Sequence, residues 1–373
     1  MSDSKQFYVF CAIFVLLGAS IAIVGPLLSN MTDAGISESS LLLLRGAGAV
    51  AALLLQQLIG FRLGFHGSRK LLFALGTAYA CLNLTDTGWH WQALFFAMGA
   101  IEALLVVAVN NLAASIARNP GSSLNVLNAC FGVGALSAPL SLTLMTSELL
   151  LWSIAAGLVA ISSFTVSGSD SVQPPKGSPG QDMSTQKLPQ AVLLFGFLYA
   201  CLELGFAHVA TKWFSLTNQT DLVVQYGVAL FWGSYTASRF FAGWILQRIA
   251  ELSLMLGCSV IAAGAGALLL IPGIDQLTLL MLCALYGIAC GPLMPTLFGW
   301  LSREGVLSER TASQYMLVAN IGVLIFPAIC WRIAIYDTTL YIQTLMMAAI
   351  IEAALIIVLY RNALRRQAIS AES

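Results

Sequence analysis

Apolar residues fill this chain in runs of about twenty, separated by short polar breaks. A spanning α-helix needs about 20 predominantly apolar residues, and twelve segments meet that requirement. Their approximate limits are 7–28, 39–60, 69–84, 91–115, 123–146, 149–166, 189–213, 222–246, 252–271, 277–301, 311–332 and 340–360. The pattern predicts an all-α, polytopic membrane protein with 12 transmembrane helices.

One polar break is much longer than the others. Residues 167–188 are rich in Gly, Ser and Pro, which is typical of a flexible linker. This cytoplasmic linker would separate an N-terminal six-helix half, residues 1–166, from a C-terminal six-helix half, residues 189–373. An internal repeat supports the division, because the spacing of Gly134 and Pro139 returns in Gly322 and Pro327, 188 residues later. Pseudo-symmetric halves around a central cavity are a common plan of transporters.

The composition agrees with a membrane protein and excludes several other classes. With 58% apolar residues, 9% charged residues and a mean hydropathy of +0.85, the chain has too few polar residues to cover the surface of a soluble globular protein. Its 17 basic and 17 acidic residues cancel and form no basic block, which argues against nucleic-acid binding. The eight cysteines are scattered without metal-binding spacing, so we expect no metal site. No phosphate loop or triad is present, and we expect neither an enzyme nor a cofactor.

Basic residues between the spans fall mostly on one side of this topology. If the N-terminus is cytoplasmic, thirteen Lys and Arg residues are cytoplasmic and only Lys212 and Arg332 lie outside. Because Lys and Arg concentrate in cytoplasmic loops, we expect both termini in the cytoplasm. The compact loops indicate a bacterial inner-membrane protein. Its expected partners are the lipid bilayer, a small-molecule substrate and H⁺ (or Na⁺), and we expect a monomer.

Several motifs resemble those of the major facilitator superfamily. The loop Gly60-Phe-Arg-Leu-Gly64-Phe-His-Gly-Ser-Arg-Lys70 is similar to its G-x-x-x-D-x-x-G-[RK]-[RK] signature, with Gly64 where the acid is expected. Leu124–Pro139 is similar to LNLLHAFFGxGAxxGP of the fucose permease-like branch of sugar:proton symporters. Phe197–Phe206 resembles its FLYVGxExGF, and Phe231–Arg239 its FWxxxxxGR. The resemblance implies a twelve-helix transporter in which Glu203 takes the acidic position of the seventh span.

Charged side chains at mid-span are functional candidates, because an ionised group costs about 2.5–3.5 kcal/mol there on insertion scales. Burial also disfavours the charged form of a carboxyl group, so Glu203 is suited to reversible protonation. The alternative for Glu203 is a structural salt bridge or a hydrogen bond between helices. The ionisable groups within the spans are Arg45, Glu102, Glu203, His208, Arg239 and Glu352.

Glu102 is the second candidate for proton coupling. Residues four apart share a helix face, so Glu102, Val106 and Asn110 form one stripe that would line a cavity. The resemblance places the acid of this helix at Val106, and Glu102 is therefore one turn further out. The same resemblance implies an acid in the first span, where only Ser20 is available. A coupling role and a structural role for Glu102 are equally compatible with the sequence.

The remaining charges favour structural or gating roles. Arg45 is expected to pair with an acid of a neighbouring helix, although an anionic substrate is the alternative. Arg239 lies near the inner end of its span and is expected to extend to the interface as an anchor. His208 is expected to be a satisfied core residue. Glu352 is in the twelfth span, which the resemblance places outside the cavity, and we assign it no role in transport.

Neutral polar and aromatic side chains form the predicted substrate site. Amides both donate and accept hydrogen bonds, which suits polyols, and an aromatic face fits a sugar ring. Alternatively, the amides join helices and the aromatic rings only pack. The candidates are Asn110, Asn128, Tyr199, Trp232, Tyr235 and Asn320.

These features together predict a secondary active transporter that moves a small, sugar-like solute by alternating access coupled to protons. Two alternatives remain open. One is a proton-driven exporter of amphipathic compounds, and the other is a non-transporting membrane sensor or assembly partner with a transporter fold. The direction of solute movement under a pH gradient separates the first two, and the third predicts no flux.

Overall fold

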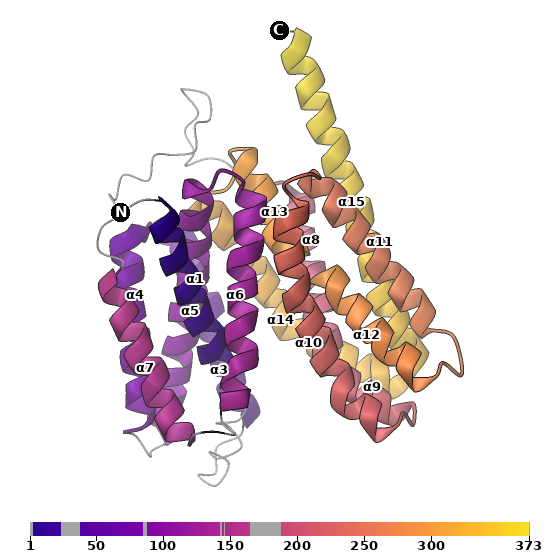
Figure 1. The fold of residues 1–373 in the computed structure, drawn as a ribbon, viewed down its shortest axis with the longest axis horizontal. Coiled ribbons are helices and arrows are strands. Elements are labelled where there is room, and N and C mark those ends of the chain that lie inside the picture. Colours follow the sequence, from indigo (N-terminus) through magenta and orange to yellow (C-terminus); the bar gives the residue numbers. More distant parts are fainter. Residues whose placement is uncertain are drawn as a thin grey trace. The chain divides into compact units, whose positions relative to one another are not determined.

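The computed structural model of the protein describes residues 3–23, 38–84, 88–141, 144, 146–164 and 188–372. Within these ranges the regular structure is helical throughout (Figure 1). Seven of the described helices are long and apolar enough to cross a membrane, and a bent helix pair raises the number to eight. Residues 167–187 of the predicted linker lie outside the described part of the chain.

Helices cover at least part of every predicted span. In the N-terminal half they are α1 (Asp3–Ala22), α3 (Glu38–Ile59), α4 (Gly64–Leu82), α5 (Gly88–Ile116), α6 (Pro120–Ser141) and α7 (Ser147–Phe164). In the C-terminal half they are α8 (Gln190–Ala200), η3 (Cys201–Gly205), α9 (Ala210–Leu216), α10 (Asp221–Ile245), α11 (Glu251–Leu269), α12 (Gln276–Cys290), α13 (Leu293–Arg303), α14 (Glu309–Tyr336) and α15 (Thr338–Glu372).

Two predicted span limits need correction, and two predicted spans are not single helices. The third span begins at Gly64 rather than at residue 69, and the helix of the last span continues to Glu372 rather than ending at residue 360. The seventh span is not one helix, because η3 is a π-helical turn and a bend of 51° separates it from α9. The tenth span is interrupted between α12 and α13, where Pro292 has no backbone N–H to donate within a helix.

Polar residues mark several helix starts. Asn119 accepts a hydrogen bond from the backbone N–H of Ser122, and Pro120 takes the first position of α6, where its missing N–H costs nothing. Asp337 caps α15 in the same way, accepting from the N–H groups of Thr339 and Leu340. These caps explain how long helices such as α14 and α15 follow one another with a single residue between them.

Asp275 caps α12 through its side chain. It accepts from the backbone N–H groups of Leu277 and Thr278, each at 3.0 Å, and from the Thr278 hydroxyl at 2.6 Å. The Thr278 hydroxyl and these N–H groups hold the pKa of the exposed Asp275 carboxyl below its usual range, because they stabilise its charged form. The carboxylate form of Asp275 is therefore the favoured cap of α12.

The helices form two compact units. Unit 1 contains Met1–Gln186 together with Leu301–Leu317, and unit 2 contains Lys187–Trp300 together with Val318–Ser373. In unit 1, α1 packs against α6, α3 against α5 and α4 against α7. In unit 2, α10 packs against α12 and α11 against α15, which are the equivalents of α3 with α5 and of α4 with α7. The same helix pairing thus occurs in both units.

The repeated glycines lie at equivalent close approaches. A Cβ atom at Gly134 of α6 would overlap the carbonyl oxygen of Val15 in α1. At Gly322 of α14, a Cβ atom would lie 2.8 Å from the Cβ of Ala200 in α8. Glycine lets helix backbones approach more closely than any other residue allows. The glycine of this repeat therefore has a packing basis in both units.

Candidate functional site

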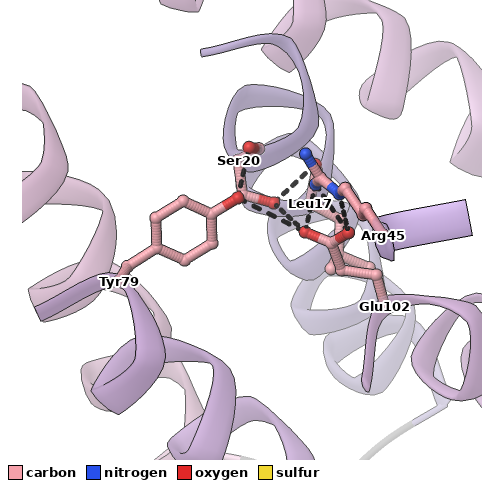
Figure 2. Close-up of polar contacts among 5 residues, drawn as sticks. All are labelled: Leu17, Ser20, Arg45, Tyr79 and Glu102. Carbon is pink, nitrogen blue, oxygen red and sulfur yellow. Dashed lines mark hydrogen bonds and ion pairs between the residues drawn. The ribbon is translucent and has the colours of Figure 1, made fainter. Parts of the chain in front are cut away.

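Two buried clusters of charged and phenolic side chains, one in each unit, contain most of the predicted site residues. The N-terminal cluster, which we define as Ser20, Arg45, Tyr79 and Glu102, lies among α1, α3, α4 and α5 (Figure 2). Arg45 pairs with Glu102 through Nε at 2.9 Å and Nη2 at 2.6 Å from the carboxylate oxygens. The carboxylate is about 95% buried and the guanidinium about 89% buried, since their exposed fractions are 5% and 11%. Arg45 thus pairs with an acid rather than standing free.

A close helix approach positions this ion pair. Gly99 of α5 lies against the backbone of Arg45 in α3, and a Cβ atom at Gly99 would overlap the Arg45 carbonyl oxygen. Glu102 follows Gly99 by three residues and therefore lies on the same face of α5. The absence of a side chain at Gly99 brings the two helices close enough for direct contact between the charges.

Two hydroxyl groups complete the N-terminal cluster. Tyr79 donates to the backbone carbonyl of Ser20 and lies 3.3 Å from the Glu102 carboxylate. Ser20 donates to the carbonyl of Leu17 at 2.8 Å, and its hydroxyl lies 3.5 Å from Glu102 (Figure 2). Each hydroxyl has one proton, and the shorter contact in each case is to a backbone carbonyl. Arg45 is therefore the main partner of Glu102.

The C-terminal cluster, defined as Tyr199, Glu203, Tyr235 and Arg239, is built differently. Glu203 lies on η3 and is only partly buried. Its carboxylate accepts a hydrogen bond of 2.6 Å from the Tyr235 hydroxyl, and that hydroxyl accepts from the Arg239 guanidinium. Tyr235 and Arg239 are four residues apart on α10 and hence share one face. In this cluster a phenol oxygen lies between the acid and the base.

The protons in this cluster can be assigned by counting donors. Arg239 only donates, so the Tyr235 oxygen must accept from it. When Glu203 is ionised, the single Tyr235 proton points to Glu203. The 2.5 Å contact between the hydroxyls of Tyr199 and Tyr235 then requires Tyr199 to be the donor. The hydrogen-bond direction within the tyrosine pair is therefore tied to the charge of Glu203.

Arg239 is 6% exposed and does not extend to the interface, contrary to the sequence-based expectation. Its Nε donates to the carbonyl of Gly291 at 2.9 Å. In a regular helix that carbonyl would accept from the N–H of residue 295, but Pro295 has none. The broken tenth segment thus supplies an acceptor that holds the guanidinium inside the protein.

The two predicted amide residues of unit 1 contact each other. The Asn128 amide donates to the Asn110 side-chain oxygen at 3.0 Å and to the Leu124 carbonyl at 2.9 Å. The Asn110 amide donates to the carbonyl of Val106 at 2.8 Å. Asn110 is fully buried and Asn128 is 5% exposed. Their contacts join α5 to α6, which is the helix-joining alternative, and they form a group separate from the Arg45–Glu102 pair.

Trp232 and Asn320 are the more accessible of the predicted substrate residues. Both are partly exposed, whereas Tyr199 and Tyr235 are 5% and 2% exposed. The Trp232 ring lies 5.2 Å from the Tyr235 ring, at an angle of 77° between the ring planes. The C-terminal cluster therefore has an aromatic neighbour that is only partly covered by protein.

Sequence reasoning did not identify Tyr79 or Glu309. Glu309, in the first turn of α14, accepts from the backbone N–H of Leu63 at 2.7 Å and of Gly64 at 3.1 Å. Both partners belong to unit 1, as does this part of α14. Glu309 thus provides a carboxylate at the start of α4, where the loop motif has Gly64 in place of an acid. Its position directly before a predicted span was the signal available in the sequence.

The long apolar helices and the two compact units are the arrangement expected of a polytopic membrane protein. A model of the Major Facilitator Superfamily matches residues 9–327, and the chain belongs to this superfamily. Membership of this superfamily identifies it as a transporter rather than an enzyme. Among curated proteins, no sequence matches the chain.

Solved structures with the same fold have low sequence identity to the chain. The E. coli fucose:proton symporter FucP is 13% identical, with a TM-score of 0.75, over 95% of this chain and 98% of its own. The human organic anion transporter TETRAN is 15% identical, with a TM-score of 0.73, over 95% of this chain and 100% of its own. The proton:xylose symporter XylE is 10% identical, with a TM-score of 0.71, over 94% of each chain.

Proposed function

We propose that this protein moves a small, sugar-like solute across the membrane by alternating access, and that Glu203 binds the coupled proton. The observation that carries the proposal is the separation of Glu203 from Arg239 by the Tyr235 hydroxyl. A carboxylate in direct contact with a guanidinium resists protonation, because protonation removes the attraction between the charges. In unit 2 the Tyr235 hydroxyl bridges Glu203 to Arg239, and Glu203 is partly exposed, so a proton from water can reach its carboxyl group.

The tyrosine pair can rearrange its hydrogen bonds when Glu203 binds a proton. When Glu203 takes up a proton, it can donate to the Tyr235 oxygen, and the Tyr235 proton then turns towards Tyr199. Arg239 keeps its acceptor at Gly291 in both states. The Tyr235 hydroxyl can thus donate to Glu203 or to Tyr199, and each direction matches one charge state of Glu203. A transport cycle that loads and releases one proton needs two such states.

The accessible side chains and the structural neighbours support a sugar-like substrate. Trp232 offers an aromatic face to a sugar ring, and Asn320 offers an amide to its hydroxyl groups. Two of the structural neighbours are a fucose:proton symporter and a proton:xylose symporter. The fucose permease-like branch is the part of the superfamily that the sequence motifs resemble. We place the protein in a bacterial inner membrane with both termini in the cytoplasm, following its basic loops.

A ligand screen followed by flux measurements tests this function. Purified protein is melted in the presence of hexoses, pentoses, organic anions and hydrophobic amines, since a bound ligand raises the melting temperature. We expect a stabilising hexose or pentose, and its uptake into proteoliposomes driven by an imposed pH gradient. Stabilisation by hydrophobic amines alone would favour export of amphipathic compounds. No flux of any stabilising solute would contradict a transport function.

The role of Glu203 is tested with the same assay. Glu203→Gln keeps the shape and an acceptor oxygen but cannot bind a proton reversibly. We expect it to abolish uptake driven by the pH gradient while solute exchange between equal solutions continues. Glu304→Gln, which changes an exposed acid in the turn after α13, is the matched control and should transport normally. Gradient-driven uptake by Glu203→Gln at the wild-type rate would exclude Glu203 as the coupling residue.

A further inference from the structure

Glu352 is an acid without a hydrogen-bonding partner in the interior of unit 2. It lies on α15 and is 0% exposed. Both of its carboxyl oxygens are buried, and neither accepts a hydrogen bond from the described residues. Glu102 and Glu203 each have hydrogen-bonding partners, so Glu352 differs from the acids of both clusters.

Among the residues that the structure describes, the helices packed around Glu352 bury no positively charged side chain. Its helix packs against α11, α8 and η3, and α12 in turn packs against α11. The buried residues of α8, η3, α11 and α12 include no Lys, Arg or His. The groups in electrostatic contact with Glu352 are thiols and a phenol: Cys201 on η3, and Tyr286 and Cys290 on α12. The other titratable groups on the buried faces of these elements are Tyr199, Cys258, Cys283 and Glu251.

A carboxylate in such a place is strongly unfavourable. Removing an isolated charge from water without a partner costs so much that the group binds a proton instead. A neutral carboxylic acid carries a much smaller cost of burial, since only a polar group is then enclosed. The geometry therefore requires that Glu352 hold a proton in this conformation.

The position of Glu352 connects it with the proposed coupling residue. The π-helical turn η3 carries Cys201 and Glu203, and α15 packs directly on it. Cys290 is in electrostatic contact with both Glu352 and Glu203. Single π-helical turns occur often at functional sites.

We propose that Glu352 is a second proton-binding carboxyl of the transporter, protonated in this conformation and able to exchange its proton with water. Transport would then involve one proton at Glu203 and a further one at Glu352. This inference extends the proposed proton coupling, but Glu352 can be observed directly. Its failure and the failure of coupling through Glu203 are therefore distinguishable.

Infrared spectroscopy of the full chain in lipid bilayers gives the first test. A protonated carboxylic acid has a C=O stretch that neither a carboxylate nor a carboxamide shows at the same position. We expect a component of this band at neutral pH that Glu352→Gln removes and Glu203→Gln retains. In D₂O the component should shift, since the acid proton is replaced by deuterium. An unchanged spectrum in Glu352→Gln would show an ionised Glu352, and a component that never shifts in D₂O would show a proton that does not exchange. Either result overturns the proposal.

Carbodiimide labelling of the wild-type chain gives a second test that needs no variant. Hydrophobic carbodiimides react with protonated carboxyl groups in apolar surroundings. A largely apolar cavity of about 360 Å³ opens beside the site, and its lining includes Leu198, Cys201, Phe326, Met347 and Ile351. We expect mass spectrometry to find the label on Glu352 at neutral pH, with less label as the pH rises.

Glu102 is the internal control for this labelling, because its carboxylate is paired directly with the Arg45 guanidinium. We expect it to stay unlabelled in the sample in which Glu352 reacts. Labelling of Glu352 no greater than that of Glu102 at every pH would overturn the proposal. The labelling result does not depend on the flux of Glu203→Gln, so each outcome can be interpreted alone.

Discussion

In unit 1 the Glu102 carboxylate touches the Arg45 guanidinium directly, whereas in unit 2 the Tyr235 hydroxyl lies between Glu203 and Arg239. Both clusters join an acid to a base among buried helices, and in both a tyrosine is close to the acid. They differ in how firmly the charge of the acid is fixed. Direct contact favours one charge state, while contact through a hydroxyl group allows two hydrogen-bond arrangements.

The difference begins with local backbone structure. In unit 1, Gly99 brings α5 close to α3, and the two charges meet. In unit 2, the Gly291 carbonyl holds the Arg239 guanidinium because Pro295 leaves that carbonyl without a helical donor. Gly99 thus allows the direct contact between Arg45 and Glu102, and Pro295 helps to maintain the contact of Arg239 with Glu203 through Tyr235. The direct pair joins α3 to α5, whereas the indirect contact joins η3 to α10.

The largest expected effect is on stability, from Glu102→Gln. This change leaves the Arg45 charge buried without its counter-ion, which typically costs about 3–5 kcal/mol. The free energy of unfolding in detergent micelles should fall by that amount, and the double variant Arg45→Met, Glu102→Gln should recover most of it. The matched substitution Glu203→Gln should cost less than about 1.5 kcal/mol, the typical net contribution of one hydrogen bond. Equal losses at the two sites would contradict the distinction between the clusters.

An intermediate effect is expected from Tyr235→Phe. Removing the hydroxyl leaves Glu203, Arg239 and Tyr199 each without one hydrogen-bond partner, and an unsatisfied buried group costs about 1–3 kcal/mol. The variant should also change the pH dependence of solute uptake, because Glu203 would face Arg239 without the intervening hydroxyl. Trp232→Phe, on the same helix, keeps that hydroxyl and serves as the control for stability. A wild-type pH profile in Tyr235→Phe would show that the hydroxyl does not mediate the contact.

The smallest effect is expected at Asp275, which lies outside both clusters. Hydrogen bonds to its carboxylate lower its pKa, so this cap stabilises the folded state at neutral pH. The stabilisation should disappear as the pH falls through about 4 and then through the lower pKa of the folded state. Asp275→Asn does not titrate, and its melting temperature should approach that of the wild type over this range. If the difference in melting temperature between the wild type and Asp275→Asn stays constant with pH, the cap stabilises α12 through its geometry and not through its charge.

The membrane-spanning segments could be read from the sequence because bilayer thickness sets their length. Hydropathy located a helix at every predicted span but could not show the π-helical turn at Cys201–Gly205, since such a turn depends on neighbouring helices. Glu203 and Arg45 were recognisable because a charge within an apolar run is conspicuous. Tyr79 was not, because a tyrosine in an apolar helix looks the same whether it packs or bonds to an acid.

The expectation for Arg239 was wrong for an instructive reason. Arg239 lies close to the helix end, which suggested that its side chain would reach the membrane interface. That reasoning ignores hydrogen-bond acceptors on other helices. The segment Gly291–Pro295 contains two prolines, and each removes a backbone donor. That pattern predicts a free carbonyl, but only the packing of α10 against α12 shows which side chain binds it.

The wide turn η3 also determines which changes the seventh segment can accept. Successive residues of a regular helix point about 100° apart. The extra residue in the π-helical turn therefore rotates the side chains that follow it by about that angle relative to the side chains of α8. The Gly205 carbonyl in this turn accepts a hydrogen bond from the Tyr341 hydroxyl of α15 at 3.1 Å. A substitution in this turn would alter one side chain. Deletion of a single residue would instead rotate Glu203 away from its partners, or rotate α8 so that its buried side chains no longer face their neighbours. The spacing of this segment is therefore as much a functional property as its chemistry.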